Sequence, residues 1–386
     1  MKRIIKLLTL LIINYSLFIA MPVPSSALED NFGQDSSDFG SETLINALPE
    51  EAREFMNDNN ITSDNAGALG LSPFSVIRGI WDMLMNELTR PLRMLAALTG
   101  VILLSAIVET LRDGADSGKA GNTGRASDAF GIVGVLAGAG LMIMYVSDIT
   151  LRAGAALHSG GVFLLTFVPV FAGVMAVAGQ LTTASVFAVS VITAGQVFTY
   201  ITSMILMPLA SVILGVSAAG AITPDLKIEA LAGTVQKVVI WTLGLLVAIF
   251  TGLLSLQSFV SSSADTVALR AAKFTVSNSV PFIGGAVSDA LSTVRGSMNV
   301  LRNSTGTFGI IAGLVIIAPT LISVFVHKIA LSIAAAISSI FGLSQLSGLL
   351  KSGESVMGII FALLFCFTLI VIISVGLMLM IWNGGV

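Results

Sequence analysis

Residues 162–223 read VFLLTFVPVFAGVMAVAGQLTTASVFAVSVITAGQVFTYITSMILMPLASVILGVSAAGAIT and contain no Asp, Glu, Lys or Arg. At about 20 residues per bilayer crossing, this run of 62 residues holds two or three membrane spans. Pro169 and Pro208 interrupt it, as does the polar stretch Gly179-Gln180-Leu181-Thr182-Thr183. The run leaves open whether two or three crossings occur, and it predicts an all-α polytopic membrane protein.

The composition of the whole chain agrees with a membrane protein. Of its 386 residues, 55% are hydrophobic and 11% are charged, whereas soluble proteins are about 25% charged. The formal net charge of −3 excludes a strongly basic nucleic-acid binder. The single cysteine, Cys366, excludes an intrachain disulfide and a Cys-based zinc site. We therefore expect the lipid bilayer as a partner, no nucleic acid and no cofactor.

The N-terminus has the pattern of an export signal. A basic head, Met1 to Lys6, precedes the apolar run Leu7 to Ala20, which is short for a membrane span. Small residues then precede Leu28, so we predict a signal peptide over residues 1–27 with cleavage after Ala27. The alternative is an uncleaved first anchor. Either reading places the next segment outside the cytoplasm.

Residues 28–90 have the character of an acidic, soluble region. They hold 12 of the 22 acidic residues of the chain and three basic ones. Pro49 followed by Glu50 and Glu51 predicts a helix start, because proline fits the first turn and carboxylates favour the positive end of the helix dipole. Apolar residues from Ile77 to Leu88 follow helical spacing and predict an amphipathic helix. We expect this extracytoplasmic region to be helical and small.

Residues 91–386 form the predicted membrane domain. Outside the charge-free run, apolar stretches predict spans at residues 94–108, 129–147, 238–256, 308–326, 329–350 and 356–382. With two crossings in the charge-free run, eight Lys and Arg side chains fall in cytoplasmic loops and six outside. Three crossings reverse these numbers. We therefore predict about eight transmembrane helices, within a range of seven to nine. The remaining segment, 258–304, is predicted to be amphipathic, either re-entrant or interfacial.

Two pairs of glycines have the spacing of close helix contacts in membranes. Gly134 with Gly138, and Gly309 with Gly313, form small-xxx-small patterns inside apolar runs. Such patterns allow two helices to approach closely. They suit either packing within the chain or contacts between copies, and glycine is so frequent here that both readings stay open.

The sequence offers no constellation for catalysis, so we do not expect an enzyme. It has no paired aspartates within two spans, no H-E-x-x-H sequence and no phosphate-binding loop. Prolines at positions 169, 208 and 319 fall within apolar runs and predict interrupted helices, which line substrate sites in many transporters. A stand-alone solute permease or transporter is therefore the alternative function.

In the order of its features the chain resembles the stage III sporulation protein AE family of endospore-forming bacteria. The resemblance is carried by LPEEAR at 48–53, PLRML at 91–95, FVPV at 167–170 and AKFTVSNSVPFIGGAVSDA at 272–290. The last stretch resembles the signature of the family and marks a candidate structural or assembly motif at Lys273, Pro281, Gly284, Gly285, Ser288 and Asp289. From its residues, Ser288 or Asp289 is predicted to cap the helix that contains Val294 and Met298.

The resemblance implies a non-enzymatic subunit of the channel or secretion complex that joins mother cell and forespore after engulfment. It implies a multi-pass protein of the mother-cell membrane around the forespore, needed for late forespore gene expression driven by sigma factor G. The implied partners are other membrane proteins of the same sporulation operon, with a cytoplasmic ATPase and ring-forming subunits, and indirectly a forespore membrane protein.

Overall fold

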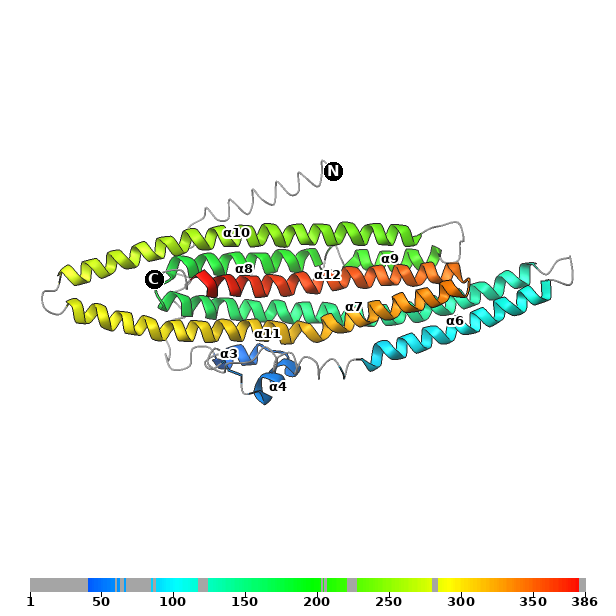
Figure 1. Cartoon of the computed structure of the whole chain (residues 1–386), viewed down its shortest axis with the longest axis horizontal. Coiled ribbons are helices and arrows are strands. Elements are labelled where there is room, and N and C mark those ends of the chain that lie inside the picture. The colour runs from blue at the N-terminus through cyan, green and yellow to red at the C-terminus, as the bar shows by residue number, and fades with distance from the viewer. Residues whose placement is uncertain are drawn as a thin grey trace, which may run out of the picture. The chain divides into compact units, whose positions relative to one another are not determined.

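The structure is a computed structural model of the 386-residue chain. It describes residues 41–59, 61–62, 66, 85, 88–116, 124–202, 204, 207–220, 228–279 and 284–381. In this part of the chain the elements are nine helices with no strand (Figure 1). The predicted all-α fold class is thereby confirmed. The predicted cleavage site between Ala27 and Leu28 lies outside the described residues.

Two short helices, α3 (Ser41–Asn46) and α4 (Glu50–Asp58), precede the long ones. Helix α4 begins directly after Pro49 with Glu50 and Glu51 in its first turn, as predicted. Arg53 fastens the two helices together, since its guanidinium donates to the carbonyls of Ile45 and Asn46 at 3.2 and 2.9 Å. Helix α4 contacts α11 and buries one apolar face.

Six of the described helices are long and apolar enough to cross a membrane. They are α6 (Thr89–Asp116), α7 (Gly124–Val177), α8 (Leu181–Ile201), α10 (Ile228–Ser279), α11 (Gly284–Ile340) and α12 (Ser344–Ile381). A shorter apolar helix, α9 (Met207–Gly220), begins one residue before Pro208. Helix α12 packs against α7, α10 and α11, so it lies centrally among the long helices (Figure 1).

The number of long helices differs from the eight predicted spans, because helices continue where charged residues had predicted ends. Helix α7 runs through Asp148 and Arg152, whose side chains pair at 3.0 Å one turn apart on an exposed face. Helix α11 runs through His327, which is buried with its Nδ1 2.7 Å from the carbonyl oxygen of Ser323. A charged or polar side chain thus marks a helix face here, and neither α7 nor α11 ends at these positions.

Two tight turns join long helices, and each depends on one glycine. Gly179 ends α7 with φ of 87°, and Gly342 ends α11 with φ of 77°. After α7, the N–H of Gln180 bonds the carbonyl of Met175 at 3.0 Å, five residues back. This pattern closes a helix with a left-handed residue, which glycine adopts without a Cβ clash. Each turn returns the chain alongside the helix that it has left.

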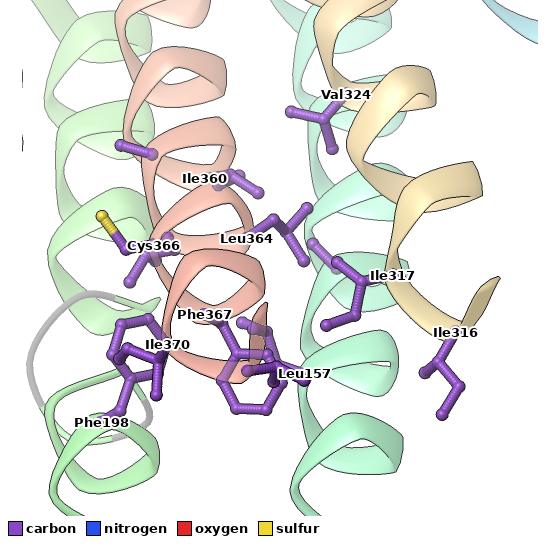
Figure 2. Close-up of a cluster of buried hydrophobic side chains, with 14 of the residues drawn as sticks. Leu157, Phe198, Ile316, Ile317, Val324, Ile360, Leu364, Cys366, Phe367 and Ile370 are labelled. Carbon is purple, nitrogen blue, oxygen red and sulfur yellow. The ribbon is translucent and has the colours of Figure 1, made fainter. Parts of the chain in front are cut away.

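Aliphatic and aromatic side chains predominate in the core between α7, α8, α11 and α12. Figure 2 shows Phe367 of α12 beside Leu157 of α7, with Phe198 of α8 on the other side. The rings of Phe163, Phe167 and Phe171 stack in sequence along α7 with centroids about 5.5 Å apart. Aromatic rings one helical turn apart thereby form a continuous apolar seam towards the α7–α8 turn.

Candidate functional site

The α7–α8 turn lies within a group of polar residues that we call the terminal polar cluster: Gln180, Thr182, Thr183, Asp265 and Arg302. The five residues come from the turn, α8, α10 and α11, which are far apart in sequence. Gln180, Thr183, Asp265 and Arg302 are all buried, and Arg302 is fully so. Buried charges in such a setting require hydrogen-bond partners, and here the partners are helix ends.

Asp265 of α10 caps the start of α8. Its Oδ1 accepts the backbone N–H of Thr182 at 2.9 Å, and its Oδ2 accepts the N–H and the hydroxyl of Thr183 at 2.9 and 2.7 Å. The first N–H groups of a helix have no partner within the helix, and the dipole makes that end positive. The carboxylate satisfies both requirements, from a residue 82 positions further along the chain.

Arg302 of α11 binds the opposite kind of helix end. One terminal nitrogen of its guanidinium donates to the carbonyls of Met378 and Leu379 at 2.7 and 3.2 Å, in the last turn of α12. The other donates to Oε1 of Gln180 at 3.3 Å. A cation at the negative end of a helix dipole is favourable, and the last carbonyls of a helix need donors. Arg302 thus connects the end of α12 to the α7–α8 turn.

The cluster places a negative side chain on a helix start and a positive side chain on a helix end, and both side chains bind residues of the α7–α8 turn or the first turn of α8. Next to it, Ser190 of α8 donates to Oε1 of Gln257 in α10 at 2.8 Å. These contacts tie α8 and α10 together and fix the end of α12 against α11. The chemistry is that of a structural joint between helix ends. In the described residues no group of His, Cys, Asp and Glu is placed to hold a metal ion.

All four glycines singled out in the sequence lie at contacts between helices of the same chain. A Cβ on Gly134 would collide with Ser105 of α6, and one on Gly138 with Leu346 of α12. Gly309 lies against the ring of Phe167 in α7, and a Cβ on Gly313 would come within 2.8 Å of Val371 in α12. Each glycine therefore makes room for a side chain of a neighbouring helix within the same chain.

The candidate motif around the α10–α11 connection is spread over two helices. Lys273 belongs to α10, Pro281 lies outside the described residues, and Gly284 and Gly285 begin α11. Ser288 and Asp289 lie in the second turn of α11, so the prediction that either caps this helix is wrong. From the second turn onwards the N–H groups bond carbonyls four residues back and need no cap.

The sequence did not single out Arg302 or Asp265 as a site. Arg302 enters the sequence-based topology only as a basic loop residue, and Asp265 is not among the predicted site residues. One signal was available: along α10 the buried face changes from apolar to polar at Ser258, Ser261 and Asp265, which have helical spacing. The interruption at residues 179–183 was recognised, although not the residues that bind it.

The long helices of the structure lie within a match to a known protein family. The family described as stage III sporulation protein AE matches residues 56–381, which include every long helix and the whole terminal polar cluster. The stage III sporulation protein AE of Bacillus subtilis (strain 168) is 22% identical over 358 residues, covering 86% of this chain and 87% of that protein. No solved structure matches the chain. The chain therefore belongs to the stage III sporulation protein AE family and is a sporulation-related membrane protein.

Proposed function

We propose that this chain is a non-enzymatic membrane subunit of the channel or secretion complex between mother cell and forespore. In this role it is required after engulfment for late forespore gene expression driven by sigma factor G. The observation that carries the proposal is the family match over residues 56–381, which extends over the entire bundle and not over a shared fragment of it. The Bacillus subtilis relative is similar over nearly its own full length.

The terminal polar cluster supports a structural role. Asp265 is committed to the N–H groups of α8, and Arg302 donates to the carbonyls of α12. Charges bound to helix ends hold the helices in place and are poorly suited to carry ions or protons in cycles, which would break these bonds. A rigid helical subunit that is driven by a partner fits this arrangement.

The proposed location is the mother-cell membrane that surrounds the forespore. The proposed partners are membrane proteins of the same sporulation operon, a cytoplasmic ATPase and ring-forming subunits among them, and through these a forespore membrane protein. Capture of these partners with the tagged full-length chain from sporulating cells is the direct assay. Retention of the ATPase or a ring-forming subunit is the expected result, and a preparation that lacks both would contradict the proposed assembly.

A clean deletion in the spore-forming bacterium that encodes this chain tests the role itself. We expect normal growth and engulfment together with a silent late forespore-specific reporter. Normal spores combined with a vegetative growth or uptake defect would overturn the proposal and favour the solute permease. Complementation with Asp265→Ala then connects the cluster to the role, with Asp148→Ala, which removes an exposed carboxylate, as the matched control.

A further inference from the structure

The terminal polar cluster is one of two polar levels on α10, α11 and α12. Hydrogen bonds place Asp265, Arg302 and the end of α12 at the first level. The second level holds Lys237, Lys328, Lys351 and Glu354. Gly353 of α12 lies against Leu331 of α11, one turn from Lys328, and Gly358 of α12 lies against Gln236, next to Lys237. Contacts between helices thus align the charges at each level.

Between the two levels each helix is free of charge. The intervals are residues 238–264 in α10, 303–326 in α11 and 355–381 in α12. At 1.5 Å per residue they are about 36–40 Å long. A bilayer has a hydrocarbon core of about 30 Å and a total thickness of about 40–45 Å. Each interval therefore has the length of one crossing and is too short for two.

The side chains on these intervals fit a lipid environment. Large apolar residues point outwards on all three helices, among them Phe259 on α10, Phe325 on α11 and Phe365 on α12. Trp241, which is 71% exposed, lies one turn from Lys237. An exposed tryptophan beside a lysine is typical of the membrane–water interface, where the ring lies at headgroup depth and the ammonium reaches water.

We propose that α10, α11 and α12 each cross the bilayer once between the two polar levels. The outer ends of α10 and α11 (residues 266–279 and 284–301) and the end of α12 then lie at the same face of the membrane. The α11–α12 turn then lies at the opposite face. Figure 1 shows this turn towards one end of the bundle and the C-terminal end of α12 towards the other. This differs from the eight-span arrangement, which places segment 258–304 and the end of the chain on opposite faces.

Cysteine labelling decides between the two arrangements. Replacement of the buried Cys366 by Ala gives a background without thiols, into which single cysteines are placed at exposed helical positions: Thr275 in α10, Ser297 in α11, Met380 in α12 and Ile340 at the end of α11. Membranes from cells that express the full chain are prepared as right-side-out and inverted vesicles. A membrane-impermeant maleimide is then added from outside.

We expect Thr275→Cys, Ser297→Cys and Met380→Cys to react in the same vesicle orientation, and Ile340→Cys to react in the other. Reaction of Thr275→Cys and Met380→Cys in opposite orientations would overturn the proposal and support the eight-span arrangement. Absence of reaction at Thr275→Cys and Ser297→Cys in both orientations would also overturn it, because it would place the outer ends of α10 and α11 within the bilayer. Labelling after detergent solubilisation confirms that each thiol is present and reactive.

Discussion

Replacement of Asp265 by Ala removes the cap of α8 and leaves three donors without their acceptor, two of them buried. Three hydrogen bonds disappear, two from the backbone N–H groups of Thr182 and Thr183 and one from the hydroxyl of Thr183. Loss of an N-cap costs about 1 kcal/mol, and buried donors without acceptors add about 1–3 kcal/mol. We therefore expect Asp265→Ala to lower the free energy of unfolding by about 2–4 kcal/mol.

The assay follows intrinsic tryptophan fluorescence of the purified chain in mild detergent as the mole fraction of a denaturing detergent rises. Asp148→Ala is the matched control, because it removes a carboxylate that pairs with Arg152 on an exposed face. Such surface pairs contribute about 0–1 kcal/mol. Asp265→Asn should fall between the wild type and Asp265→Ala, since one of its two acceptor oxygens becomes a donor. Equal loss in Asp265→Ala and Asp148→Ala would refute the assignment of the cap.

Three further predictions use the same unfolding assay. Arg302→Met should lower the free energy of unfolding by about 1–3 kcal/mol, because the carbonyls of Met378 and Leu379 lose a buried donor. Arg302→Lys should retain part of that stability. An unchanged free energy of unfolding in Arg302→Met would contradict the structural role of Arg302. Gly309→Ala should lower the free energy of unfolding by about 1–3 kcal/mol, because the added Cβ collides with the ring of Phe167. Gly252→Ala has open space around it and should leave the free energy of unfolding unchanged or raise it. Gly179→Ala should lose about 1–2 kcal/mol because φ is 87° there, and unchanged stability would show that the turn relaxes.

The sequence predicted the elements that depend on local residues. Pro49 with two glutamates marks the start of α4, and the polar interruption at residues 179–183 marks the α7–α8 turn. Both signals are local, since caps and breaks depend on neighbouring residues. Apolar runs of about 20 residues likewise identified the membrane helices, and hence the fold class.

Helix ends inside long apolar regions were harder to predict. The sequence predicts that membrane spans end near Asp148, Arg152, His327 and Lys328, because a charge in a span is costly unless it reaches water or a partner. In the structure Asp148 and Arg152 pair on an exposed face, and His327 bonds its own helix. The true break between α11 and α12 is at Gly342, whose left-handed conformation carries no sequence signal that distinguishes it from many other glycines.

The terminal polar cluster could not be predicted from the sequence for a different reason. Thr183 and Asp265 are 82 residues apart, and Gln180 and Arg302 are 122 residues apart. No periodicity connects such positions, so their contact depends on how the long helices pack. The one available signal is the buried polar face of α10 at Ser258, Ser261 and Asp265, which indicates a polar partner on a neighbouring helix.

The cap of α8 by a residue of α10 also constrains the order in which the protein matures during synthesis. When α7 and α8 leave the ribosome, the carboxylate that closes the first turn of α8 has not yet been made. The hairpin therefore enters the membrane with open N–H groups, which water or the insertion machinery must satisfy until α10 arrives. Arg302, in contrast, has already been made when α12 emerges, so the carbonyls at the end of α12 meet a donor that is already present. The start of α8 therefore gains its cap only after α10 has been made, whereas the end of α12 binds a residue made earlier.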